Sequence, residues 1–193
     1  MRAKYDKETI IAQGAELFRK KGYNFVGINE ILTTCGIPKG SFYNFFATKE
    51  DFGTQVVSWY GERQRRFITD MLKPSNGSPL ERLKGFYQHL IDANDADGLN
   101  AGCLVNNISI ELGGLNPQLG TEAHTQFQSW IDIIAKTIEE GQNQGEIRQD
   151  LRPVELAEHL HTGIYGAFAL MKTQRSRAPL DRWFKLAFAF VSA

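Results

Sequence analysis

The most informative segment of the sequence is Ile28-Asn29-Glu30-Ile31-Leu32-Thr33-Thr34-Cys35-Gly36-Ile37-Pro38-Lys39-Gly40-Ser41-Phe42-Tyr43-Asn44-Phe45-Phe46. Its first part has the apolar spacing of a short helix over 28–34, and Gly36 follows as a stop. Pro38 suits the first turn of another helix, because its missing N–H costs little there, and a helix over 39–46 is predicted. A short helix, a tight turn and a second short helix form the layout of a helix-turn-helix.

The second of these helices is unusually polar for a core helix. Four hydrogen-bonding side chains fall within six positions, namely Lys39, Ser41, Tyr43 and Asn44. Lysine and asparagine can read base edges in the major groove, and hydroxyl groups can hold phosphates. Gly40 would let the backbone approach DNA closely, and Lys49 adds a cation beside the next helix N-terminus, where phosphate binds well. A helical hairpin with a solvated polar face would show the same pattern, so the residues alone leave both interpretations open.

Helical spacing continues on both sides of this stretch. Asp6 is a suitable N-cap and Gly22 a suitable end for a helix over 7–21, and Thr48 can cap a helix that runs to about residue 72. Further helices are predicted over 80–93, 104–112, 117–142, 154–174 and 180–191, with breaks rich in Gly, Pro, Asp and Asn between them. The sequence therefore predicts an all-α protein of about nine helices.

Composition is that of a globular protein with no membrane segment. Apolar residues make up 42% of the 193 residues, enough for a packed core. The longest wholly apolar run, 186–191, is far too short to cross a membrane, and no apolar stretch of signal-peptide length follows the N-terminus. A cytoplasmic location is expected.

The net charge of zero conceals a small asymmetry. Residues 1–53 carry 8 Lys and Arg against 6 Asp and Glu, a net of +2, and residues 54–193 carry 14 against 16, a net of −2. This difference permits a DNA-facing N-terminal region without requiring one, because binding depends on where the charges lie.

The sequence lacks the motifs of an enzyme or a metal protein. It contains no phosphate loop, nucleophile elbow, metal box or paired catalytic set. Cys35 and Cys103 belong to no CxxC pair or zinc spacing, and His159 and His161, two residues apart, share no helix face. We expect no catalytic activity, no cofactor and no metal.

The N-terminal region resembles the tetracycline-repressor (TetR) family. The resemblance lies in Ala15-Glu16-Leu17-Phe18, in Gly22-Tyr23 and in Gly36-Ile37-Pro38-Lys39-Gly40-Ser41-Phe42-Tyr43-Asn44-Phe45-Phe46-Ala47-Thr48-Lys49-Glu50. It covers roughly residues 7–53 without gaps. It implies an all-helical homodimer that regulates transcription, most commonly by repression, from a roughly palindromic double-stranded DNA operator. It also implies a DNA-binding domain at 1–48 and a helical ligand-binding and dimerisation domain at 49–193.

The resemblance assigns roles by position within the helix-turn-helix. The residues it implies at base edges are Lys39, Gly40 and Asn44, and those along the phosphates are Ser41, Tyr43, Phe45 and Lys49. Two positions depart from the commonest family pattern. Gly27 stands where a Thr or Ser usually caps the second helix and touches phosphate, and Phe45 stands where His is frequent. One phosphate hydrogen bond is expected to be missing at each. A helical interaction module that has lost DNA binding is the alternative, and the intact run from Lys39 to Lys49 argues against it.

Two apolar stripes in the C-terminal region suit either a dimer interface or ordinary core. They consist of Leu156, Leu160, Ile164, Ala167, Leu170 and Met171 on one helix, and of Phe184, Phe188 and Val191 on the last. Gly163 and Gly166 would allow another helix to approach closely. Two such helices packed against their symmetry mates would make a four-helix interface, the interpretation we favour, although some of these residues must serve the core.

Two mechanisms of release from DNA are open. The segment Ala101-Gly102-Cys103-Leu104-Val105-Asn106-Asn107 resembles a narrower branch of the family, the repressors that respond to electrophiles and oxidants, typified by the repressor of N-ethylmaleimide reductase. A cysteine at the start of a helix lies at the positive end of the dipole, which favours the nucleophilic thiolate. Cys103 is therefore either a sensor or a small buried residue.

A noncovalent small-molecule inducer is the other mechanism. Inducer pockets are mostly apolar and aromatic. The candidate lining residues are Phe86, Tyr87, Phe127, Trp130, Tyr165 and Phe168, which ordinary core packing would explain equally well.

Overall fold

The computed structural model describes residues 5–100 and 102–193. Residues 1–4, which enter the charge count above, and Ala101, in the segment around Cys103, lie outside the described residues. The described chain forms nine α-helices, one short 3₁₀-helix and a single isolated antiparallel bridge between Ile147 and Ser192. The predicted all-α class is confirmed. The helices are α1 Lys7–Lys21, α2 Ile28–Cys35, α3 Lys39–Phe45, α4 Lys49–Met71, η1 Pro74–Asn76, α5 Pro79–Ala96, α6 Leu104–Leu112, α7 Pro117–Asn143, α8 Pro153–Gln174 and α9 Ala178–Val191.

Capping groups set the first helices where the sequence predicts them. The Asp6 carboxylate accepts the backbone N–H of Thr9 at 2.9 Å and so begins α1. Gly36 ends α2 in the left-handed region, at φ 61°, where a side chain would be strained. Pro38 was expected in the first turn of α3, and it lies one residue before that turn. It is the extended N-cap of α3, at ψ 151°, and the helix begins at Lys39.

The described chain divides into two compact units. One contains the described residues up to Arg63 together with Cys103–Gln126, and the other contains Gln64–Gly102 together with Phe127–Ala193. Helices α4 and α7 contribute residues to both units, and α6 belongs with the N-terminal helices. The functional boundary at residues 48 and 49 stays a prediction, because a division by packing does not test it.

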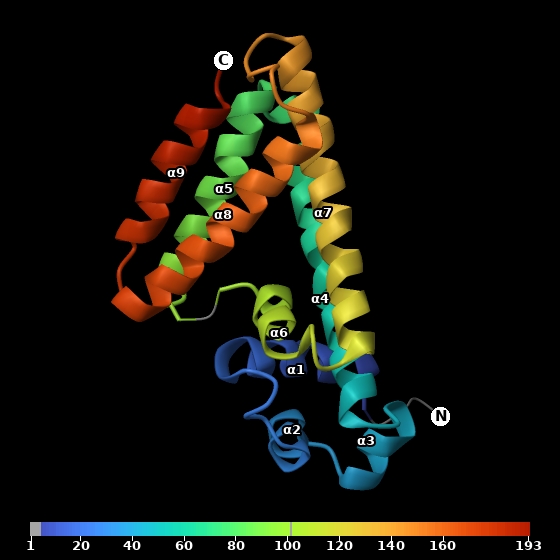
Figure 1. Ribbon diagram of the computed structural model, residues 1–193. Helices are drawn as coiled ribbons and strands as arrows, with labels where there is room; N and C mark the ends of the chain where they lie inside the picture. Colours follow the sequence, from blue (N-terminus) through green and yellow to red (C-terminus); the bar gives the residue numbers. More distant parts are fainter. Residues whose placement is uncertain (1–4, 101) are drawn as a thin grey trace. The chain divides into compact units, whose positions relative to one another are not determined.

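Aromatic side chains form the core of the first unit, where α1, α2 and α3 gather around the first turns of α4 (Figure 1). Phe42 of α3 lies 5.3 Å, between ring centroids, from Phe52 of α4, and Phe46 lies 4.8 Å from Phe52. Gly14 of α1 makes room for this cluster, because a Cβ there would lie 2.2 Å from the Phe52 ring. Burial of these rings therefore fixes α3 against α4.

In the second unit, α9 packs against both α8 and α5. Ser78 and Glu81 form a capping box that starts α5. Gly163 allows α8 and α9 to approach closely, because a Cβ there would lie 2.3 Å from Nε1 of Trp183.

The apolar stripes of α8 and α9 lie mostly inside the single chain. The stripe residues that are buried there are Leu156, Leu160, Ile164, Ala167, Met171, Phe188 and Val191. The interface interpretation was therefore wrong for these residues, because neighbouring helices of the same chain already cover them.

Candidate DNA interface and effector site

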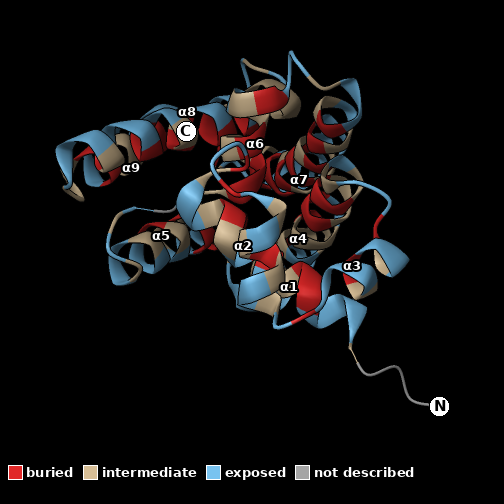
Figure 2. Ribbon diagram, turned by 90° about the horizontal axis from the view of Figure 1, so that it is seen from below, coloured by how far each residue is buried: buried red, intermediate tan, exposed pale blue. Residues whose placement is uncertain are grey.

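Helix α3 presents one buried and one solvent-facing side. Phe42 is fully buried, and the side chains of Lys39 and Asn44 are exposed. Tyr43 is 44% exposed, and its ring packs edge-on against Phe42 at 5.4 Å between centroids. Figure 2 marks exposed residues along the outer side of α3. The polar groups that sequence reasoning selected therefore share the accessible side of one short helix, and Ser41 and Phe45 are half-buried at its margins.

Two glycines near this surface are not required by the protein's own packing. A Cβ built on Gly27 or on Gly40 would meet nothing within 4 Å, and neither residue has a positive φ. Gly27 is the N-cap of α2 and has no side-chain cap bond. A glycine inside a helix lowers its stability, so Gly40 weakens α3 without relieving any contact within the chain.

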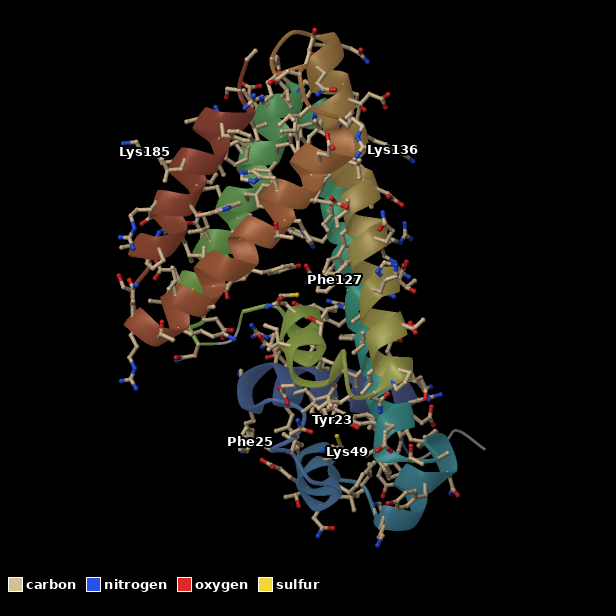
Figure 3. All side chains as sticks on the ribbon, in the orientation of Figure 1. Tyr23, Phe25, Lys49, Phe127, Lys136 and Lys185 are labelled. Carbon is tan, nitrogen blue, oxygen red and sulfur yellow. The ribbon has the colours of Figure 1, made fainter. Side chains whose placement is uncertain are left out.

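Lys49 points back into its own unit. Its Nζ donates a hydrogen bond to the Tyr23 carbonyl at 2.7 Å and lies 4.1 Å from the centre of the Tyr23 ring. Figure 3 shows the two side chains next to each other. Burial lowers the pKa of Lys49, which the charges of Glu50 and Glu111 partly counteract. Its predicted phosphate contact would require the ammonium group to leave this position.

Glu111, near the end of α6, holds the turn between α1 and α2. Its carboxylate accepts the backbone N–H groups of Tyr23 at 3.2 Å and of Asn24 at 3.0 Å. The side-chain amide of Asn107, one turn earlier on α6, donates to the Arg19 carbonyl at 3.4 Å. Helix α6 is thus tied by side chains to the segment that precedes the helix-turn-helix.

Cys103 is the N-cap of this same helix. It is half-buried, forms no disulfide, and has an extended backbone at φ −92° and ψ 128°. The Leu104 backbone N–H faces the hydroxyl of Tyr60 on α4. The pKa of Tyr60 is raised by burial first and by the neighbouring Cys103 next. The thiol therefore lies at the positive end of α6, close to a tyrosine hydroxyl.

Cys35 has a different environment. Its Sγ donates a weak hydrogen bond to the Ile10 carbonyl at 3.8 Å, and burial raises its thiol pKa to about 11. A protonated thiol is a poor nucleophile, so this environment suits a packing role for Cys35 rather than a reactive one.

Four of the six predicted pocket residues form one cluster between α7 and α8. Phe127 lies 5.6 Å from Trp130 and 5.6 Å from Tyr165, and Tyr165 lies 6.1 Å from Phe168, between ring centroids. Phe127 and Tyr165 are half-buried, whereas Trp130 and Phe168 are buried. Figure 3 labels Phe127 on α7, on the side that faces α8. We call these four residues together with His161 the aromatic cluster.

The other two predicted pocket residues belong to a separate group. Phe86 and Tyr87 of α5 contact each other at 4.8 Å, and Tyr87 packs against Trp183 and Phe188 of α9. The structure therefore does not bring all six aromatic residues together.

His161 lies inside the aromatic cluster and was missed as a site residue. Its ring contacts Phe127, Trp130 and Tyr165, and burial lowers its pKa to about 4. His159 instead stacks on Phe190 of α9 at 4.8 Å. The sequence allowed only the conclusion that the two histidines do not share a face, and no periodicity marks His161 as special.

Three large apolar side chains of the second unit remain exposed on α8 and α9. They are Leu170, Leu186 and Phe190, which are 51%, 68% and 40% exposed. Gly166, one turn before Leu170, is also exposed and has open space around it.

The sequence matches two models of one protein family. Residues 79–187 match the family described as "Tetracyclin repressor-like, C-terminal domain", and residues 10–53 match "Bacterial regulatory proteins, tetR family". The chain belongs to the TetR family of bacterial transcriptional regulators. Its helix-turn-helix, α2 and α3, lies within the matched N-terminal segment.

Relatives of this TetR-family chain match it over nearly its whole length. The HTH-type transcriptional repressor DhaR of Mycobacterium sp. (strain GP1) is 35% identical, over 94% of this chain and 90% of DhaR. The HTH-type transcriptional repressor NemR of Escherichia coli K12 is 26% identical, over 91% of this chain and 88% of NemR. These relatives support a helix-turn-helix transcriptional repressor.

Solved structures agree with the fold. The regulatory protein TetR from Rhodobacter sphaeroides is 30% identical with a TM-score of 0.89, over 95% of this chain and 97% of that one. The reduced form of E. coli NemR is 25% identical with a TM-score of 0.89, over 96% of both chains.

Membrane-spanning helices and metal-binding clusters are absent from the part of the chain that the structure describes. No helix among residues 5–100 and 102–193 has the length and hydropathy needed to span a bilayer. The same residues contain no group of three or more His, Cys, Asp or Glu side chains arranged to hold a metal ion.

Proposed function

We propose that this TetR-family regulator is a dimeric repressor that reads its operator with α3 in the major groove and carries out no catalysis. The observation that supports the proposal is the two-sided character of α3. Phe42 anchors the helix in the core, and Lys39, Tyr43 and Asn44 extend from the opposite, accessible side. A helix that exposes donors and acceptors in this way matches the major groove in size and chemistry.

Each exposed group has a distinct role in the proposal. Lys39 and Asn44 contact base edges, where lysine suits guanine and asparagine suits adenine. Gly40 lets the α3 backbone approach the bases. The phosphate contacts come from Ser41, Tyr43, Phe45 and Lys49, and Gly27 and Phe45 each lack one side-chain hydrogen bond that the commonest family pattern would supply.

The proposed dimer interface uses the exposed sides of α8 and α9. Gly166 and Leu170 of α8, with Leu186 and Phe190 of α9, would meet their symmetry mates in a four-helix arrangement. Exposed leucine and phenylalanine side chains on adjacent helices are typical of a protein–protein contact. A two-fold dimer makes the operator roughly palindromic, with recognition helices about 34–36 Å apart or a multiple of that spacing.

Release from DNA is proposed to start in one of two places. Modification of Cys103 by an electrophile or oxidant would act through α6, whose Glu111 holds the turn before the helix-turn-helix. Binding of a noncovalent inducer would act through the aromatic cluster. The N-cap position and neighbouring Tyr60 support the first route, and the half-buried rings of Phe127 and Tyr165 support the second.

The experiment that tests this function is selection of bound sequences from randomised double-stranded DNA, followed by measurement of affinity against salt. We expect an enriched inverted repeat and an affinity that falls steeply as salt rises. Sedimentation at micromolar concentration should give a dimer. A monomer that enriches no sequence would contradict the proposal and favour a helical interaction module.

A further inference from the structure

His161 carries a polar atom that the protein leaves unpaired. Its side chain is only 5% exposed, and Nε2 lies 3.0 Å from the hydroxyl oxygen of Tyr165 one turn later on α8. The other ring nitrogen, Nδ1, is buried and has no hydrogen-bond partner. Buried polar groups are nearly always paired, because an unpaired one loses the bonds it made to water. An unpaired nitrogen at this place points to a partner that comes from outside the chain.

The surroundings of His161 favour an uncharged aromatic partner. The rings of Phe127, Trp130 and Tyr165 approach it at 5.8, 5.7 and 4.7 Å between centroids, each in an edge-to-face arrangement. Burial lowers the pKa of His161 to about 4, so the imidazole is neutral near neutral pH. An anion would lose its hydration at such a site without gaining a cation, whereas a flat apolar ring would gain ring contacts.

The hydrogen bond to Tyr165 decides what Nδ1 can offer. A neutral imidazole has one N–H donor and one acceptor nitrogen. The phenol is a stronger acid than an imidazole N–H, so we assign the donor role in this pair to the Tyr165 hydroxyl and the ring proton to Nδ1. Nδ1 is therefore a donor, and its missing partner is an acceptor such as a carbonyl oxygen.

We propose that His161 is the polar anchor of an effector site in the aromatic cluster, and that this site takes an uncharged aromatic compound whose carbonyl oxygen accepts a hydrogen bond from Nδ1. The proposal deepens the noncovalent route of the proposed function and rests on it. His161 fixes the orientation of the ligand, and the rings of Phe127 and Tyr165 contact its apolar part.

Three small probes of nearly equal shape test this chemistry on the full chain. Acetophenone has the carbonyl oxygen, α-methylstyrene has a CH₂ group in its place, and benzoate adds a negative charge. Ligand-observed NMR titration gives the affinity of each, and the ratio of acetophenone to α-methylstyrene affinity is the measured quantity. Benzoate should bind the wild type more weakly than acetophenone.

Substitutions at His161 isolate the hydrogen bond. His161→Phe keeps a ring of similar shape and should lower the affinity ratio by roughly 3–10-fold, the value of one hydrogen bond of ordinary strength. His161→Asn places an amide donor near the position of Nδ1 and should restore most of the ratio. Tyr165→Phe removes the hydroxyl that fixes the tautomer of His161, so it should lower the affinity ratio by a smaller factor. This variant replaces His161→Phe in the test if His161→Phe does not fold.

An unchanged ratio in His161→Phe overturns the proposal. Tighter binding of benzoate than of acetophenone, or no binding of any probe up to its solubility limit, overturns it as well. Operator binding, measured on the same preparations, tests the proposed function separately from the ligand site. If the wild type binds its operator and the affinity ratio is unchanged in His161→Phe, the assignment of His161 as polar anchor is wrong and the proposed function stands. If the wild type binds no DNA and the affinity ratio falls in His161→Phe, the proposed function is wrong and the ligand site stands.

Discussion

Glu111 near the end of α6 accepts a hydrogen bond from the Tyr23 backbone N–H at 3.2 Å, across 88 residues of sequence. The Tyr23 carbonyl in turn accepts from Lys49 Nζ at 2.7 Å, at the start of α4. One residue of the turn between α1 and α2 thus connects α6 to the helix that follows α3. This connection gives a change at Cys103, at the other end of α6, a physical route to the recognition helix.

Glu111→Ala is expected to weaken both the fold and the operator complex. Loss of hydrogen bonds to a charged carboxylate should lower the free energy of unfolding by about 1.5–3 kcal/mol, and operator affinity should fall because the turn before the helix-turn-helix is no longer held by α6. Urea unfolding and fluorescence anisotropy with labelled operator measure the two effects. Ile110→Ala, an exposed neighbour on α6, is the matched control and should change neither. Equal operator affinity in both variants would refute the connection.

Gly40→Ala should separate stability from DNA binding. A Cβ at Gly40 meets nothing within 4 Å in the free protein, so alanine should stabilise α3 by about 0.5–1 kcal/mol. The same methyl group would stand between the backbone and the bases, and operator affinity should fall. Thermal unfolding and operator titration of one preparation check both signs. A variant that is more stable and binds operator normally would show that this backbone does not approach DNA.

Alkylation of Cys103 should release the operator, if the thiol is the switch. A polar or bulky adduct must repack its neighbours, at a cost of about 1–3 kcal/mol, and a ~100-fold loss of affinity needs ~2.7 kcal/mol of preference for the nonbinding form. Operator binding is measured before and after treatment with a thiol-alkylating agent, for the wild type, Cys103→Ser and Cys35→Ser.

The two serine variants should behave oppositely. Cys35→Ser should respond as the wild type does, since the raised pKa keeps the Cys35 thiol protonated. Cys103→Ser should not respond. A Cys103→Ser protein that still loses the operator would place the switch elsewhere, and a wild type that is alkylated at Cys103 and still binds would make the thiol irrelevant to release.

His161 should make the fold less stable in mild acid. Burial lowers its pKa in the folded state to about 4, whereas an unfolded histidine has a pKa of about 6.5. Between these values the unfolded chain binds a proton that the folded chain does not, so the free energy of unfolding falls as pH falls. The loss should reach roughly 2 kcal/mol at pH 5. Urea unfolding at pH 8 and pH 5 measures this fall in the free energy of unfolding, which should be smaller in His161→Phe than in the wild type by that amount. An equal fall in the two proteins would contradict the buried, neutral state of His161.

Features that depend on neighbouring residues in the sequence could be predicted, whereas contacts between distant residues could not. Asp6 and Gly22 fixed α1 because a cap and a stop act on adjacent residues. The end of α5 was placed three residues too early, at Ala93, because the chain stays helical until the positive φ of Gly98. The apolar stripe of α8 correctly marked a buried face but could not tell which chain covers it. The Glu111 bond and the unpaired Nδ1 of His161 depend on tertiary packing, which no local pattern encodes.

The most direct test of DNA reading by α3 is the operator affinity of Lys39→Ala and Tyr43→Phe beside the wild type, by fluorescence anisotropy on the selected operator and on copies with single base changes. Lys39→Ala should lose ~1–3 kcal/mol and become indifferent to one base pair of each half-site. Tyr43→Phe should weaken binding to all the sequences by a similar factor. Wild-type affinity and wild-type base preference in both variants would contradict the assignment of α3 as the DNA-reading helix.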